Sequence, residues 1–308
     1  MLGNKLKILN HFFRRNDNIK GYLFILPVFL LFAVFILYPL IFSIILSFFE
    51  WKGFSNKPFE FFVYFDNYIR FVKDPVFSLV LKNTIVLVFI VIIFQNLLGL
   101  AFALFLFYGK IAGSSAYRAI IFFPVLLSEV AIGLAWRQIF IQDGLLNLIL
   151  KAIKLDSLAI PWLSNSITPI IAISIVVIWQ FSGFNMVIYY AAIQSLDKFQ
   201  IESARIDGAN IVQIIIKIVV PQLMRTISIL LILNIIGTFK IFGIIFVMTG
   251  GGPAHYSDVL TTYMYSKSFS ILGSNLMGYG SAIAVFLTGI VLIFAIMRIY
   301  FEKKFIND

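Results

Sequence analysis

The sequence predicts an all-α membrane protein that crosses the bilayer about six times, and three observations lead to this prediction. Of the 308 residues, 61% are hydrophobic and only 12% are charged, whereas an ordinary soluble domain carries about 25% charged residues. Uncharged stretches long enough to span a bilayer recur along the chain. The positive charges lie mostly in the short segments between those stretches, as the positive-inside rule expects. These features exclude a water-soluble globule.

The first element is an uncharged stretch of 29 residues between Lys20 and Glu50, in which Pro27 and Pro39 are potential kink sites. It is too long for the core of a signal peptide, so we expect it to remain as an anchor. The second span is predicted from the 27 uncharged residues between Lys82 and Lys110. The six predicted spans are about 21–49, 80–107, 119–140, 168–193, 224–248 and 277–300.

Charged residues interrupt two of these spans. The third contains Glu129 and Arg137, and the fifth contains Lys240. The fourth lies within the 40 uncharged residues between Asp156 and Asp197, a stretch too long for one helix, which predicts an interfacial segment before the span. A charge within the bilayer costs about 2.5–3.5 kcal/mol on insertion scales, so such residues commonly mark a transport pathway.

Counting basic residues in alternate segments predicts the orientation. With the N-terminus in the cytoplasm, the inner segments hold 14 Lys and Arg and the outer segments hold 7. Both termini are therefore expected to be cytoplasmic. The organisation is then a cytoplasmic segment at 1–20, a six-span domain at 21–301 and a cytoplasmic tail at 302–308.

Several chemistries are disfavoured by what the sequence lacks. It contains no cysteine and only two histidines, His11 and His255, far apart in the chain. We therefore expect no thiolate or histidine metal site. No phosphate-binding loop of the form Gly-x-x-x-x-Gly-Lys-Ser/Thr occurs, so the chain is not expected to bind ATP. The basic residues form no nucleic-acid-binding pattern, and neither a cofactor nor an enzymatic activity is expected of this chain.

The segment 197–221, between the fourth and fifth spans, has a distinct pattern. It predicts two short helices with a break, with Glu202 near the start of the first helix. Gly208 is expected to end that helix or to allow a close approach by another protein, and Pro221 to interrupt the chain before the fifth span. Taken by composition alone, this is an ordinary polar loop.

The same segment is similar to the EAA loop of binding-protein-dependent ABC importer permeases. Glu202, Ser203 and Ala204 occupy the three EAA positions, with serine in place of the first alanine. The pattern continues with Arg205, Asp207, Gly208, Ile218 and Pro221. The run at 204–209 resembles the sugar-transporting branch of that family.

A second resemblance lies at residues 239–269, similar to a family segment that ends in Val-Met-Thr-x-Gly-Gly-Pro. Gly243 stands where the family usually has an aspartate, so no acidic role is assigned to that position. The matching residues are Val247, Met248, Thr249, Gly251, Gly252 and Pro253.

The resemblance implies a subunit of the maltose and glycerol-3-phosphate permease type in a bacterial or archaeal plasma membrane. Its implied partners are a second six-span permease, two ATPase subunits that bind ATP and magnesium, and an extracytoplasmic binding protein. The solute would be a mono- or oligosaccharide, or glycerol phosphate. The implied contacts with the ATPase are Glu202, Ser203, Ala204, Arg205, Asp207, Gly208 and Pro221.

Polar and aromatic residues within the spans are candidates for the solute pathway, because sugars bind to aromatic faces and to groups that replace the hydration of their hydroxyls. The alternative is structural, since such residues also pack helices together and anchor interfaces. The candidates are Trp179, Gln180, Asn185, Tyr189, Asn234, Lys240 and Glu129.

The alternative function is a secondary transporter driven by an ion gradient. That mechanism needs titratable or cation-binding groups near the middle of the membrane, and Glu129 is the main candidate. An enzyme embedded in the membrane is less favoured still, because no span contains paired acids, a Ser/His arrangement or a histidine cluster.

Overall fold

The computed structural model describes residues 22, 24–53, 57–109, 111–269 and 275–307, and for 301–307 the backbone alone. The predicted segment 1–20 lies outside these residues. Within them the chain is helical, with a single antiparallel bridge between Phe49 and Phe62 and no strand, which confirms the all-α prediction. The elements are η1 (Ala33–Leu37), α2 (Tyr38–Leu46), α3 (Asp66–Lys73), α4 (Pro75–Tyr108), α5 (Ser114–Phe122), η2 (Phe123–Leu126), α6 (Glu129–Phe140), α7 (Leu145–Ala152), η3 (Asp156–Leu158), α8 (Thr168–Gln194), α9 (Lys198–Ile206), α10 (Ile211–Ile214), η4 (Ile215–Val219), α11 (Val220–Gln222), α12 (Met224–Phe239), α13 (Gly243–Met248), α14 (Leu260–Ser268) and α15 (Met277–Asn307).

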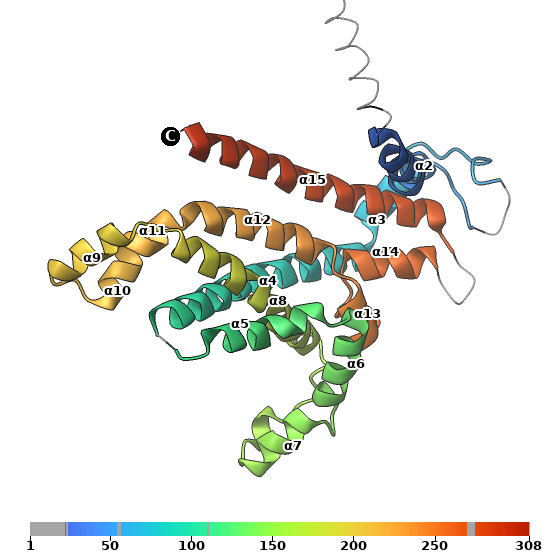
Figure 1. Cartoon of the computed structure of the whole chain (residues 1–308). Coiled ribbons are helices and arrows are strands. Elements are labelled where there is room, and N and C mark those ends of the chain that lie inside the picture. Colours follow the sequence, from blue (N-terminus) through green and yellow to red (C-terminus); the bar gives the residue numbers. More distant parts are fainter. Residues whose placement is uncertain (1–21, 23, 54–56, 110, 270–274, 308) are drawn as a thin grey trace, which may run out of the picture.

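The helices α4 and α8 form the centre of the molecule (Figure 1). With 34 residues, α4 is about 51 Å long at 1.5 Å per residue. The two helices approach closely where a Cβ on Gly99 would lie 2.5 Å from the Cβ of Asn185. Both are apolar over most of their length, so burying one against the other removes a large apolar area from lipid-exposed surface.

Four described helices are long and apolar enough to cross a membrane by themselves: Phe24–Leu46, Pro75–Tyr108, Thr168–Gln194 and Met277–Tyr300. They correspond to the predicted first, second, fourth and sixth spans. The count reaches six when two bent pairs of helices are each taken as one span. At the C-terminus, α15 continues through the predicted tail at 302–308 as far as Asn307.

The third predicted span, 119–140, is not a continuous helix. The segments Ser114–Leu126 and Glu129–Ala152 meet at 96°. Pro124 lies in the 3₁₀ turn η2, and Leu127 and Ser128 are extended, so the helical hydrogen bonding stops there. Glu129 is therefore the first residue of a helix that starts at the break, and its predicted position in the middle of a span is corrected.

The fifth predicted span, 224–248, is also broken. Helix α12 ends at its cap residue Lys240, and α13 begins three residues later at Gly243. At its other end, Ile211–Gln222 meets Met224–Phe239 at 67°. The sequence predicts that Pro221 interrupts the chain before the fifth span. In the structure Pro221 lies within the short helix α11, directly after the π-helical turn η4, and the bend comes two residues later.

Candidate functional site

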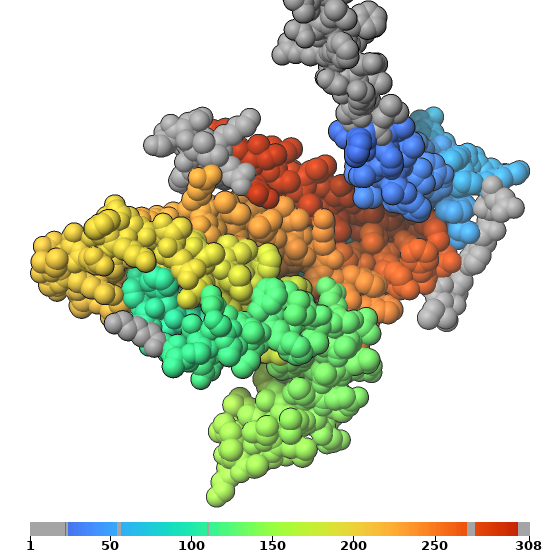
Figure 2. Space-filling model, in the orientation of Figure 1, coloured from blue at the N-terminus to red at the C-terminus, as the bar shows by residue number. Residues whose placement is uncertain are grey.

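The coupling segment, residues 197–222, forms one end of the molecule (Figure 1), and Figure 2 shows it in yellow as a protruding knob. Asp197 caps α9 by accepting a hydrogen bond from the Phe199 amide at 2.9 Å. Two buried side chains, Ile201 and Ile214, join the apolar cluster that also contains Leu106 of α4. The segment is thereby fixed to the end of the α4–α8 pair.

Local hydrogen bonds shape the turn between α9 and α10. Gly208 has φ +84°, a left-handed conformation suited to glycine, and ends α9 as predicted. Asn210 and Gln213 then form a reciprocal capping box with both bonds at 2.9 Å. A bond of 2.7 Å from Gln222 Nε2 to Gln200 Oε1 ties the two arms together. The turn at Gly208 and the capping box follow from the local sequence, whereas the Gln222–Gln200 bond joins residues 22 positions apart.

The outward face of α9 carries Glu202, Ser203 and Arg205, while Ala204 is half-buried. Glu202 is the fifth of the nine residues of α9, so it lies in the middle of the helix, whereas the sequence predicted a place near its start. Sequence reasoning missed the two apolar side chains on this face. Phe199 is 79% exposed and Ile206 is 87% exposed, and their spacing of seven residues places them on one side of the helix.

Within the membrane-spanning part, the two helix breaks face each other across a cavity of about 520 Å³, here called the inner pocket. Glu129, at the start of α6, lies beside Gly243, where a Cβ would come 2.5 Å from Glu129 Oε2. Lys240, at the end of α12, lines the same pocket. A carboxylate at a helix N-terminus and an ammonium at a helix C-terminus each interact favourably with the helix dipole.

The two charges do not neutralise each other directly, since no ion pair joins Glu129 to Lys240 among the described residues. Two amides and two phenyl rings contribute to the lining: Gln95, Asn234, Phe181 and Phe184. The pocket thus combines apolar ring surfaces with hydrogen-bond donors and acceptors, as small-molecule sites commonly do.

Behind the pocket, polar side chains of α4, α8 and α12 form a buried network. Gln95 Nε2 donates to Asn234 Oδ1 at 3.1 Å and to Asn185 Oδ1 at 3.3 Å. Asn96 Oδ1 accepts from Asn185 Nδ2 at 3.3 Å and from the Tyr189 hydroxyl at 2.8 Å. The Asn234 Nδ2 atom is buried without a hydrogen-bond partner in the described residues, so the network contains one unsatisfied donor beside the pocket.

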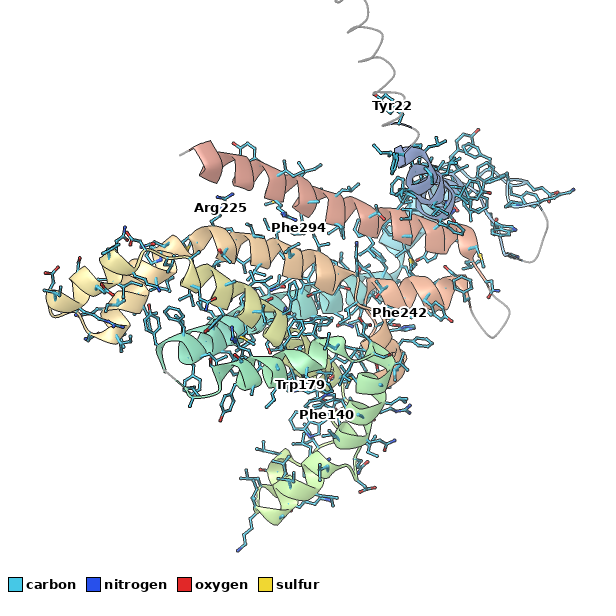
Figure 3. The ribbon with its side chains drawn as sticks, viewed as in Figure 1. Tyr22, Phe140, Trp179, Arg225, Phe242 and Phe294 are labelled. Atoms are coloured by element: carbon cyan, nitrogen blue, oxygen red, sulfur yellow. The ribbon has the colours of Figure 1, made fainter. Side chains whose placement is uncertain are left out.

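The structure brings together three of the seven pathway candidates, Glu129, Asn234 and Lys240. Asn185 and Tyr189 lie behind them in the network, and Gln180 is buried with Nε2 donating to the Leu127 carbonyl at 3.4 Å. Trp179 lies elsewhere; it lines a separate apolar cavity and makes an edge contact with Trp136 at 5.4 Å. Figure 3 shows Trp179 near Phe140, on which Trp136 is stacked.

Sequence reasoning missed Gln95 and Asn96, which lie at the centre of the network. The available signal was a pair of adjacent amides within the apolar stretch that follows Thr84 in α4. Such amides frequently join neighbouring helices in membranes, so the pattern alone did not separate a pocket from a helix contact.

Comparison with known proteins identifies the family. Residues 85–307 match the family described as "Binding-protein-dependent transport system inner membrane component". The chain belongs to this family. The resemblance seen in the sequence is therefore confirmed, and the protein is a membrane-embedded permease component of an ABC transporter rather than a catalytic subunit.

Relatives match over nearly the whole chain. The probable ABC transporter permease protein YurN of Bacillus subtilis is 34% identical over 93% of this chain and 97% of its own length. The multiple sugar-binding transport system permease protein MsmF of Streptococcus mutans is 30% identical over 97% and 98%. The lactose transport system permease protein LacF of Rhizobium radiobacter is 29% identical over 94% and 96%.

A solved structure shares the fold. A chain of a bacterial ABC transporter involved in the import of the acidic polysaccharide alginate superposes with a TM-score of 0.78. The superposition covers 94% of this chain and 99% of the alginate transporter chain, at 23% sequence identity. At this identity the likeness shows the fold alone.

Proposed function

We propose that this chain is one of two permease subunits of an ATP-driven importer that takes up a carbohydrate across a bacterial or archaeal plasma membrane. An extracytoplasmic binding protein delivers the sugar, a second six-span permease completes the pathway, and two ATPase subunits bind ATP and magnesium. The observation that carries the proposal is the inner pocket, in which amides, phenyl rings and two unpaired charges converge at two helix breaks. Discontinuous helices form the solute sites of many membrane transporters.

The lining favours a sugar over glycerol phosphate. Phe181 and Phe184 offer apolar surfaces for a sugar ring, while Gln95 and Asn234 offer hydrogen bonds to hydroxyls. A phosphate would gain from Lys240 but would face the carboxylate of Glu129 in the same cavity. The names of LacF and MsmF, which refer to lactose and to multiple sugars, agree with this choice.

The coupling segment supports the link to an ATPase. Helix α9 presents Phe199 and Ile206 at a spacing that fits a helix seated in a groove, with Glu202, Ser203 and Arg205 on the same outward surface. ATP binding would then bias the spans between inward-open and outward-open states through the α4–α8 pair, to which the segment is packed. Asp207, Gly208 and Pro221 shape the segment around that helix.

The test is transport by the complete complex in liposomes, with the binding protein present on the outer side. Labelled lactose, maltotriose, N,N′-diacetylchitobiose and glycerol 3-phosphate serve as probes. We expect uptake of at least one sugar that requires ATP. Uptake driven by a proton or sodium gradient without ATP would establish the secondary-transporter alternative instead, and uptake of glycerol 3-phosphate alone would overturn the carbohydrate assignment.

A further inference from the structure

A second cavity lies at the far end of the α6–α13 pair from the inner pocket. It encloses about 580 Å³ and is here called the outer pocket. The inner pocket reaches the first residue of α6, whereas the outer pocket is lined by residues at the end of that helix and at the end of α13. The residues used below are Arg137, Ser164, Phe246, Thr249 and Gly252.

A narrow contact separates the two cavities. Glu129 and Arg137 are eight residues apart on α6, which places them about 12 Å apart along the helix axis. Between them, Gly133 packs against Val247 so closely that a Cβ on the glycine would lie 3.1 Å from the valine side chain. The packed α6–α13 pair therefore lies between the two cavities and separates them.

The outer pocket combines the groups that hold a sugar. Arg137 is the one charged side chain on its wall, and no ion pair engages it among the described residues. Phe246 is 43% exposed, and its ring is backed by Phe242 and Tyr265, with centroids 5.1 Å away in each case. An exposed ring fixed in this way can pack on the apolar face of a pyranose, while the guanidinium and the Ser164 hydroxyl donate to its hydroxyls.

The wall opposite α6 is held in place before any ligand arrives. The Ser257 hydroxyl shares its one proton between the Gly252 carbonyl at 2.7 Å and Thr249 Oγ1 at 2.8 Å. Asn83 of α4 donates through Nδ2 to the carbonyls of His255, Tyr256 and Asp258 at 3.0–3.1 Å. A preformed wall lowers the entropy lost when a ligand binds.

We propose that the outer pocket is a second carbohydrate subsite, which holds a ring of a neutral sugar before that sugar reaches the inner pocket. The inference rests on the proposed function, since it assumes a sugar on this pathway. A neutral sugar is favoured because an anionic sugar would next meet Glu129 in the inner pocket.

The absence of cysteine from the chain provides the test. Ser164→Cys places a single thiol in the outer pocket, and Ser166→Cys places one two residues further on, at an exposed position that does not line it. Alkylation by a maleimide is followed on this chain by mass spectrometry, in the complete complex with lactose, maltotriose or N,N′-diacetylchitobiose. We expect the transported sugar to slow alkylation of Ser164→Cys at least fivefold and to leave Ser166→Cys unchanged.

A second substitution links protection to the ring. Phe246→Ala in the Ser164→Cys background is expected to abolish the protection, whereas Phe269→Ala, an exposed ring that does not line the pocket, should preserve it. If Ser164→Cys fails to assemble, Ile141→Cys offers a thiol on another wall of the same pocket.

Two outcomes overturn the subsite while leaving the proposed function intact. The first is an unchanged alkylation rate at sugar concentrations that saturate ATP-driven uptake by the same variant. The second is equal protection by the sugar-free binding protein, which would make the pocket a protein contact. Failure of the proposed function is a different result, namely no ATP-driven uptake of any probe by the unsubstituted chain.

Discussion

The coupling segment (197–222) and the outer segment (249–263) are stabilised in opposite ways. The coupling segment is shaped by hydrogen bonds between its own residues, such as the Asp197 cap, the Asn210–Gln213 box and the Gln222–Gln200 bond. The outer segment is held by bonds that span most of the chain, as in Asn83 to Asp258, 175 residues apart. A segment that forms locally can expose most of its side chains to a partner, whereas one built by long-range bonds must bury them.

The charged groups follow the same division. In the coupling segment Glu202, Arg205 and Asp207 are exposed. In the outer segment Asp258 is buried, where it accepts from Thr262 Oγ1 at 2.7 Å and contacts His255 Nδ1. The lesson is that one segment leaves its charges exposed, where a partner can reach them, while the other uses a buried carboxylate to bind side chains of its own segment.

A matched pair of glycines tests this comparison with the largest expected effect. Gly251→Ala and Gly208→Ala both place a Cβ at positive φ, +86° and +84°, at a cost of about 1–2 kcal/mol. At Gly251 the Cβ would also lie 1.9 Å from Asp258 Oδ1, whereas at Gly208 nothing lies within 4 Å. We expect Gly251→Ala to lose about 3–5 kcal/mol and Gly208→Ala only about 1–2 kcal/mol.

The measurement is the fraction of monodisperse protein after heating, followed by fluorescence-detected size-exclusion chromatography of a fluorescent fusion. Equal losses for the two variants would contradict the division between an open and a packed segment.

The next effect concerns the exposed face of α9. Phe199→Ser should weaken association with the ATPase about 10–100-fold, since burying a phenylalanine contributes about 1.5–3 kcal/mol. Its fold should be unchanged because the side chain is 79% exposed. Binding of the detergent-solubilised permease pair to the purified ATPase gives the affinity. Phe105→Ser, at a similarly exposed position on α4, is the control. An equal loss of affinity in that variant would show that α9 does not form the contact with the ATPase.

A smaller effect is expected at the anchor of the outer segment. Asn83→Ala removes the donor from three backbone carbonyls and should destabilise the protein by about 1–3 kcal/mol. Asn165→Ala, the same change at an exposed position, should stay within about 0.5 kcal/mol of the wild type. The heating assay compares the stability of the two variants. If Asn83→Ala were as stable as the wild type, the outer segment would not depend on its bonds to α4.

The smallest effect is a pH dependence at Asp74, the cap residue of α4. Burial raises the pKa of Asp74, but hydrogen bonds from Tyr263, the Val76 amide and Tyr279, together with nearby Lys267, outweigh burial and lower the pKa overall. A lowered carboxyl pKa contributes stability that is present above the unfolded pKa of about 3.9 and is lost as the pH falls through the folded value.

Asp74→Asn should therefore weaken the protein at neutral pH and flatten the loss of stability below about pH 4. The folded fraction is measured between pH 7 and pH 3 by the same chromatography. Asp156→Asn, at an exposed carboxylate, serves as the control and should follow the wild-type curve. A wild-type acid response in Asp74→Asn would assign that response to other groups.

Much of the fold could be predicted from the sequence, but the helix breaks could not. The apolar stretches predicted spans that correspond to the four continuous helices, but they predicted the third and fifth spans as single helices where the structure has bent pairs with other bounds. The breaks depend on side chains from distant helices that bond the freed carbonyls: Gln180 donates to Leu127, and Thr261 donates to Ile241. Hydropathy carries no information about such partners.

The residues of the inner pocket could also be predicted only in part. Glu129, Asn234 and Lys240 could be selected because polar groups are rare within apolar spans. Their convergence on one pocket could not be predicted, because it requires both breaks to face each other. Trp179 shows the limit of residue type as a guide, since an aromatic ring in a span lines a different, apolar cavity.

The sequence by itself determined the membrane location, the helical class, the family and the turn at Gly208, because each follows from local composition or from short patterns along the chain. Tertiary structure alone decided where the third and fifth spans break, which polar groups share a cavity and how the outer segment is held. The physical reason is that these features depend on hydrogen bonds and close contacts between residues up to 189 positions apart, which no local pattern encodes.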